Sequence, residues 1–188
     1  MPIPATTLVP FPAQDRSKVC FLDTETTGLD YATDEVIQLA IVLLDGTVAY
    51  EGYFKPTNKT EWPEAQRVNH ISPDMVAEAP FLVDEKGCIE DILAGCDVIS
   101  GWNVKYDIEM LRAGGIVFPE GVRFCDLMPA FCDAWRKEHP EYPLDRSRER
   151  LVRATQWLGI RHNAHDAFGD TEVLVPIWKW VVDRANGE

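Results

Sequence analysis

Two acidic residues, Asp23 and Glu25, stand two positions apart directly after the apolar run Val19–Leu22. The run predicts a buried strand, and the two-residue period of a strand puts both carboxylates on one face of the sheet. Neighbouring carboxylates in a low-dielectric site repel each other, so one of them takes up a proton unless a cation lies between them. Oxygen ligands favour a hard divalent cation, and the pair therefore predicts a site for Mg²⁺ or Mn²⁺.

The Asp-x-Glu spacing alone has little weight in a chain that contains 31 acidic residues. It occurs in three places, at Asp23 with Glu25, Asp107 with Glu109, and Asp170 with Glu172. Only the first pair ends a predicted strand and continues into the turn Thr26-Thr27-Gly28. The other pairs fall at predicted helix starts, where positions i and i+2 do not share a face, so we expect Glu109 and Glu172 in solvent.

Two further acids complete a candidate ligand set. Asp107 follows the short apolar run 98–100 at a predicted strand-to-helix junction, although an acid there is also favoured by the helix dipole alone. Asp170 lies in the first turn of the last predicted helix, five residues after His165. This spacing lets an imidazole on the loop lie over the carboxylate, where it can take a proton from water, although a lone histidine there can equally be a surface or capping residue. His139 and His162 have no such neighbour and are interpreted as structural.

The assembled set predicts a particular chemistry. Four carboxylates balance the charge of two divalent cations, and two metals about 3.5 to 4 Å apart can hold the attacking and departing oxygens of an in-line phosphoryl displacement. A nearby histidine would then activate the water.

The remaining chain predicts one α/β domain in which a mixed sheet is flanked by helices. Strands are expected at 19–22, 36–44, 48–54, 98–100 and 122–125, with a hairpin turn at Asp45-Gly46. Helices are expected at 63–68, 73–77, 82–94, 106–113, 127–137, 147–158 and 167–184, with a polar loop at 138–146. The carboxyl ends of the strands are where such sheets place their active sites.

Residues 1–16 differ from the domain at 17–188 because four prolines crowd the first 13 positions. Prolines exclude a regular helix, so we expect an extended or loosely attached arm. The start has neither the basic residues nor the apolar core of a secretory signal, and no window approaches the roughly 20 apolar residues that a membrane span needs. The odd number of cysteines, five, without a Cys-x-x-Cys pair, predicts core thiols and a reducing cytoplasm.

The net charge of −13 opposes binding of a long polyphosphate by a broad basic surface. A nucleic-acid substrate would therefore have to be held locally, with metal assistance, by its end.

The ordered motifs resemble those of the DnaQ-like, or DEDDh, exonucleases, which include polymerase proofreading subunits, ribonuclease T and oligoribonuclease. The motifs are Asp23-Thr-Glu-Thr-Thr-Gly-Leu29, Asn103-x-x-x-Asp107 and His165-x-Ala-x-x-Asp170, within a likeness that covers about residues 17–183. The first motif is specific to the family, and the three motifs in this order are strong evidence for the resemblance.

The resemblance implies a ribonuclease H-like fold with a central mixed five-stranded sheet, and hydrolysis of single-stranded nucleic acid from the 3′ end to release nucleoside 5′-monophosphates. It implies that Asp23, Glu25, Asp107 and Asp170 bind two metal ions and that His165 is the general base. It also implies substrate contacts by Thr26, Leu29 and Asn103.

One segment departs from the family pattern. Residues 63–71 resemble its Val-His-Gly-Ile stretch, but Asn69 replaces the histidine and His70, a predicted substrate contact, replaces the glycine. Arginines at 146, 148, 150 and 153 either guide phosphate or neutralise local acids.

Other functions stay open on the sequence alone. A non-catalytic nucleic-acid-binding module of the same fold and a metal-dependent phosphodiesterase for small nucleotides both fit the residues. The choice between ribose and deoxyribose, and the choice between a free domain, a polymerase-attached domain and a homodimer, are also open.

Overall fold

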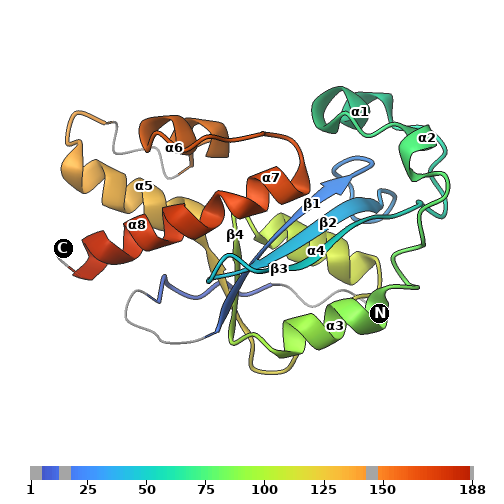
Figure 1. The fold of residues 1–188 in the computed structure, drawn as a ribbon, viewed down its shortest axis with the longest axis horizontal. Helices are drawn as coiled ribbons and strands as arrows, with labels where there is room; N and C mark the ends of the chain where they lie inside the picture. Colours follow the sequence, from blue (N-terminus) through green and yellow to red (C-terminus); the bar gives the residue numbers. More distant parts are fainter. Residues whose placement is uncertain (1–5, 13–17, 143–147, 187–188) are drawn as a thin grey trace.

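Figure 1 shows the computed structural model, which describes residues 6–12, 18–142 and 148–186. Five strands form one sheet in the order β3-β2-β1-β4-β5. The strands are β1 Val19–Thr26, β2 Val36–Leu43, β3 Val48–Tyr53, β4 Val98–Gly101 and β5 Arg123–Asp126. β2 runs antiparallel to β1 and β3, whereas β1, β4 and β5 are parallel, so the predicted mixed five-stranded sheet is confirmed.

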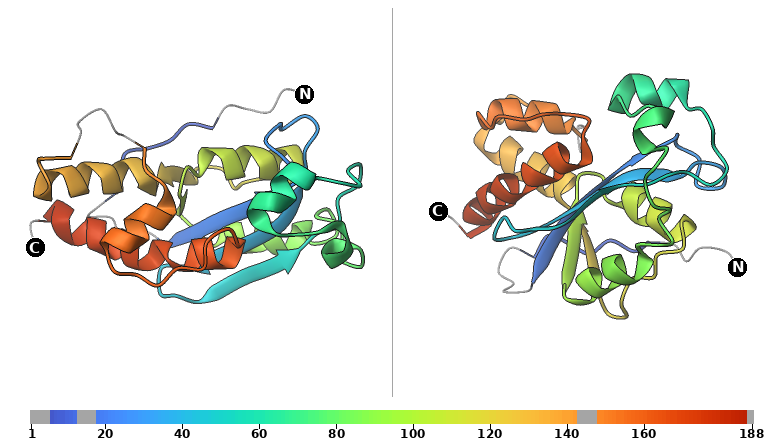
Figure 2. Two further views of the ribbon diagram at one scale, coloured as in Figure 1. Left: turned by 90° about the horizontal axis from the view of Figure 1, so that it is seen from above. Right: turned by 45° about the vertical axis from the view of Figure 1, so that its right-hand side comes forward.

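Helices cover both faces of the sheet (Figure 2). They are α1 Pro63–Asn69, α2 Pro73–Val76, α3 Lys86–Ala94, α4 Lys105–Ala113, α5 Leu127–Glu138, α6 Leu151–Trp157, α7 Ala167–Glu172 and α8 Leu174–Asn186. The alternation along β1 divides the core, because Cys20 and Leu22 pack with α3 and α4, whereas Val19 and Phe21 pack with α5 and α8.

The last predicted helix, 167–184, is divided in the structure between α7 and α8 at Val173. Pro176 explains the division, because it has no N–H to donate and its ring would clash with the carbonyl of Glu172 in a continuous helix. α3 and α6 begin four residues later than predicted. Residues 143–147, which include Arg146 and the end of the predicted loop 138–146, lie outside the described residues.

Residues 6–12 of the predicted arm are extended, but they are not loose. Leu8 forms a parallel bridge with Phe124 of β5, and the Val9 N–H donates to the Phe124 carbonyl oxygen at 2.7 Å. The ring of Phe11 packs against Trp178 with centroids 4.5 Å apart. The segment covers β5, which is the edge strand, and so removes unpaired backbone groups from that edge.

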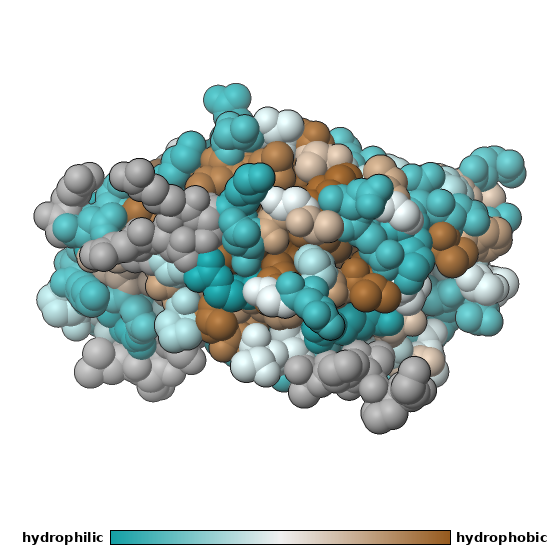
Figure 3. Space-filling model, turned by 90° about the horizontal axis from the view of Figure 1, so that it is seen from below, coloured by the Kyte–Doolittle hydropathy of each residue, from teal (hydrophilic) through white to brown (hydrophobic). Residues whose placement is uncertain are grey.

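Four cysteines are buried, as predicted, and Cys88 on α3 is exposed. Among the described residues, no helix combines the length and the apolar character that a membrane span requires. The face seen from below in Figure 3 mixes hydrophilic side chains with small apolar patches.

Candidate active site

Three carboxylates converge at the carboxyl end of β1. Asp23 and Glu25 come from β1 and Asp170 comes from α7, and one oxygen of each lies within 4.8 Å of the others. In Figure 1 the tip of β1 lies between α1 and the start of α7. The two-residue period of the strand and the packing of α7 on β1 and β2 together place these acids on one face.

Asp107, the fourth predicted ligand, reaches the same strand end from the first turn of α4. β4 lies beside β1, as the prediction required, with Val19 opposite Val98. The buried Asp107 carboxylate accepts hydrogen bonds through Oδ1 from the backbone N–H of Thr24 at 3.0 Å and from its hydroxyl at 2.7 Å. Asp107 is therefore hydrogen-bonded to β1 beside the three acids, but it is not one of the three whose oxygens lie within 4.8 Å of one another.

The electrostatics of the cluster agree with the prediction of crowded acids. Burial, followed by repulsion from neighbouring carboxylates, raises the pKa of Asp23 well above its usual range. Burial is also the main cause that raises the pKa of Glu25 to about 8, that of Asp107 to about 7, and that of Asp170 above its ordinary value. A divalent cation would offset the repulsion among these buried carboxylates, so the donor set fits such an ion.

Gln38 fixes α7 to the sheet. It stands opposite Glu25 in the β1–β2 ladder and is buried. Its Nε2 donates to Asp166 Oδ1 at 2.7 Å, and its Oε1 accepts from the Ala167 N–H at 3.2 Å. The other oxygen of Asp166 caps α7 by accepting from the Gly169 N–H at 3.1 Å. These bonds determine where Asp170, one residue further, meets β1.

Gly169 allows the close approach of the preceding loop. A Cβ at this position would lie 2.3 Å from the carbonyl oxygen of Asn163, which is backbone and cannot move aside easily. The absence of a side chain therefore lets the loop 159–166 pack directly on α7.

Two histidines of this loop differ in their surroundings. His165, the predicted base, is exposed and has a φ of 66°. The ring of His162 is buried, and its Nε2 lies 2.5 Å from Asp170 Oδ1. Sequence reasoning missed this contact, because a loop has no periodicity from which a partner can be inferred.

The turn after β1 is held rigidly beside a groove. The Thr26 hydroxyl and the Tyr106 hydroxyl each donate to the carbonyl oxygen of Gly28 at 2.7 Å. Leu29 follows with 80% of its surface exposed. The groove has a volume of about 780 Å³ and is lined by Glu25, the turn and residues of α1, including Val68.

The family departure at Asn69 and His70 has a structural counterpart. Asn69 is buried, donates through Nδ2 to the carbonyl oxygen of Thr26 at 3.1 Å and accepts from the Ile71 N–H at 3.1 Å. Burial raises the pKa of Glu25, and the Asn69 amide nearby partly offsets that rise. His70 is exposed at the end of α1 with a φ of 61°, so Asn69 is the member of the pair that lines the groove.

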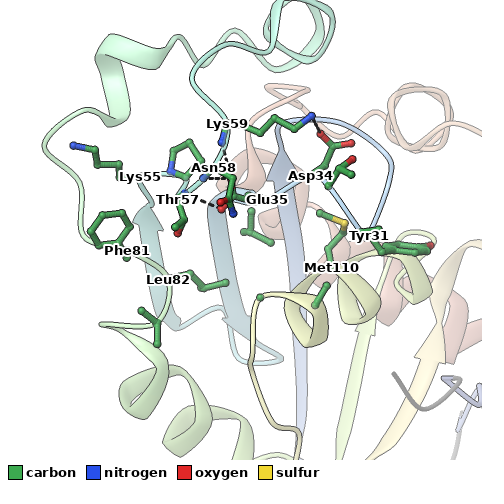
Figure 4. A pocket seen from close by; sticks show the side chains of 17 residues that line it. Tyr31, Asp34, Glu35, Lys55, Thr57, Asn58, Lys59, Phe81, Leu82 and Met110 are labelled. Carbon is green, nitrogen blue, oxygen red and sulfur yellow. Dashed lines mark hydrogen bonds and ion pairs between the residues drawn. The ribbon is translucent and has the colours of Figure 1, made fainter. Parts of the chain in front are cut away.

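A second cavity, of about 580 Å³, lies beside the loop that follows the turn (Figure 4). The Glu35 carboxylate accepts from the backbone N–H groups of Thr57, Asn58 and Lys59 at 2.7 to 3.0 Å. Lys59 is also ion-paired with Asp34 at 3.0 Å. None of the four predicted ligands lines this cavity, so we interpret these bonds as the support of the loop.

The other predicted positions are more peripheral. Asn103 is exposed after β4 with a φ of 64°, and its N–H donates to Asp126 Oδ1 at 3.0 Å. Burial raises the pKa of Asp126, an effect that backbone hydrogen bonds and the charge of Arg148 partly offset, and Arg153 pairs with Glu149 at 3.5 Å. These two arginines therefore neutralise local acids.

The second members of the other two acidic pairs stay outside the cluster. Glu172 is exposed, as predicted, whereas Glu109 is only partly exposed and lies 3.9 Å from Lys105.

Comparison with known proteins identifies the family to which this site belongs. A family model described as Exonuclease matches residues 20–177. The chain belongs to this exonuclease family. Membership confirms the resemblance to the DnaQ-like exonucleases and identifies the chain as a hydrolase of the nuclease class. A curated relative, DNA polymerase III subunit epsilon of Treponema pallidum, is 25% identical over 167 residues, which cover 85% of this chain and 74% of the relative.

Solved structures confirm the ribonuclease H-like fold. E. coli exonuclease I in complex with a dA16 oligonucleotide matches with a TM-score of 0.71 and 23% identity, covering 92% of this chain and 42% of that one. Exonuclease I from Methylocaldum szegediense matches with a TM-score of 0.68 and 25% identity, covering 90% of this chain and 41% of that one. The chain thus spans about two fifths of the length of these exonucleases.

Proposed function

We propose that this chain hydrolyses the phosphodiester bond at the 3′ end of single-stranded nucleic acid and releases nucleoside 5′-monophosphates. The observation that carries the proposal is the convergence of Asp23, Glu25 and Asp170 beside a groove bordered by an exposed leucine. The family supports it, as do the exonuclease I structures that hold a dA16 oligonucleotide or single-stranded DNA.

The acids provide the sites for two divalent cations, Mg²⁺ or Mn²⁺. Asp23, Glu25 and Asp170 would hold them, with Asp107 adjacent, and four carboxylates balance their charge. When bound, such ions supply positive charge to the attacking and leaving oxygens of the phosphoryl transfer.

The other residues position substrate and water. His165, exposed on the loop before α7, takes the proton of the attacking water. Leu29 wedges against the terminal base, and Thr26 and Asn103 contact the terminal strand. His70 stays a predicted substrate contact at the exposed end of α1. Because the molecule carries a charge of −13, it holds the end of a strand rather than a long duplex.

Digestion of labelled oligonucleotides tests the proposal. Incubation with 5′-labelled single-stranded DNA or RNA and Mn²⁺ is expected to give a ladder of shortened products that EDTA abolishes. Asp170→Asn serves as the matched inactive control. If neither substrate gives a ladder, the proposal is wrong, and metal-dependent cleavage of a small phosphodiester alone would instead support the phosphodiesterase. Parallel digestion of matched DNA and RNA identifies the preferred sugar.

His165→Ala is expected to lower turnover by a factor on the order of 10² or more, because the water then lacks its general base. Mn²⁺ affinity, measured by calorimetry, is expected to change little, because the His165 ring is exposed and is not one of the grouped ligands. His139→Ala is the control, because that histidine packs on Trp135 and does not belong to the acidic cluster. Turnover near that of the control would remove His165 from the mechanism.

A further inference from the structure

A buried histidine outside the family motifs touches the metal site. His162 lies on the loop between α6 and α7, and only 4% of its side chain is exposed. Its Nε2 lies 2.5 Å from Asp170 Oδ1, and its Nδ1 lies 3.2 Å from Thr155 Oγ1. The ring is therefore held from both sides.

The contact on the far side of the ring is itself fixed. Thr155 is buried in α6, with 1% of its surface exposed, and its hydroxyl donates to the carbonyl oxygen of Val152 at 2.9 Å. The imidazole thus connects α6 to the acid on α7. Such a connection restricts rotation of the Asp170 side chain more than a solvent contact would.

We infer that His162 is a positioning residue that orients Asp170 for a divalent cation. The contact between its Nε2 and Oδ1 leaves the other carboxylate oxygen for the ion. Groups that hydrogen-bond to a metal ligand fix its orientation, and their loss typically costs 10- to 100-fold in metal affinity or activity. The inference rests on the metal site of the proposed function.

Burial separates this role from that of a catalytic base. A ring that is 4% exposed and engaged at both nitrogens has no free nitrogen with which to receive a proton from an attacking water. His165, exposed three residues later, has that access. The two histidines therefore have distinct roles, one toward the ligand and one toward the water.

Calorimetric titration with Mn²⁺ tests the inference without a substrate. His162→Phe keeps a planar ring but removes the donor, and it is expected to weaken Mn²⁺ binding by about tenfold or more. His162→Gln restores an N–H near the position of Nε2, and its affinity is expected to fall between that of His162→Phe and the wild type. His139→Phe, at a partly exposed histidine, is the matched control.

Two results would overturn the inference. One is a folded His162→Phe variant that binds Mn²⁺ as tightly as the control. The other is equal weakening in the Phe and Gln variants, which would assign the effect to the shape of the ring. Thermal unfolding without metal reports whether each variant is folded.

A second variant serves if His162→Phe does not fold. Thr155→Val keeps the volume in α6 and removes the partner of Nδ1, and it is expected to weaken Mn²⁺ binding by about fivefold, the equivalent of one hydrogen bond. Unchanged affinity in this variant would contradict a ring that is held from both sides.

The outcomes distinguish this inference from the proposed function. A wild-type protein that binds Mn²⁺ in a His162-dependent manner but gives no oligonucleotide ladder would refute the nuclease reaction and leave the positioning role intact. A ladder from the wild type, combined with unchanged Mn²⁺ affinity in His162→Phe, would refute only the positioning role.

Discussion

Asp23→Asn is expected to reduce turnover by a factor on the order of 10³ or more, since a ligand that holds the cations contributes several kcal/mol of transition-state stabilisation. The amide has nearly the shape of the carboxylate, so the loss would come from charge and from one oxygen ligand. Asp23 is the best site for this test because its charge interacts with Asp107, Asp170 and Glu25 together.

The matched control is Glu172→Gln, which removes one negative charge from an exposed position just outside the cluster. Both variants are compared with the wild type by kcat on a single-stranded oligonucleotide in saturating Mn²⁺. A kcat for Asp23→Asn within tenfold of the control would show that Asp23 does not hold the catalytic cations.

The parts of the site that were predictable are those that regular structure dictates. The strand period places Asp23 and Glu25 on one face, and the adjacency of parallel strands brings Asp107 to the same edge. The α/β class follows from the same alternation of patterns. The prediction of one helix over 167–184 was wrong, because it did not take account of Pro176, which prevents a continuous helix there.

The parts that were not predictable depend on contacts between distant segments. Gln38 and Asp166 are 128 positions apart, and no local pattern on β2 predicts that the Gln38 amide binds the residue before α7. His162 meets Asp170 through a loop without periodicity, and Asn69 reaches Thr26 only because α1 folds over the end of β1. In each case tertiary packing, which single-sequence patterns do not encode, selects the partner.

The arm illustrates the same limit at the edge of the sheet. Its prolines correctly exclude a helix, but its pairing partner is a strand more than 100 residues away, Phe124 being opposite Leu8. An extended segment has the same sequence pattern whether it lies in solvent or against an edge strand.

Removal of metal is expected to make the stability of the protein fall as pH rises. In the metal-free folded state the pKa of Glu25 is about 8, against an ordinary value of 4.5 that applies to the unfolded chain. Between these values the folded state retains a proton that the unfolded state has lost, so the free energy of unfolding decreases with rising pH until the folded carboxyl is also ionised. The contribution of Glu25 is on the order of 5 kcal/mol, lost progressively between pH 4.5 and pH 8.

Urea unfolding between pH 5 and pH 9 measures this dependence, once in EDTA and once in saturating Mn²⁺. Mn²⁺ is expected to flatten the decrease because the cation stabilises the ionised carboxylates of the folded state. Glu25→Gln isolates the group: without metal it is expected to be less sensitive to pH than the wild type and more stable at pH 8, because the neutral amide has no proton to lose on ionisation. Identical pH profiles for the two proteins in EDTA would contradict a crowded acid cluster, and with it the physical reason for placing cations among these side chains.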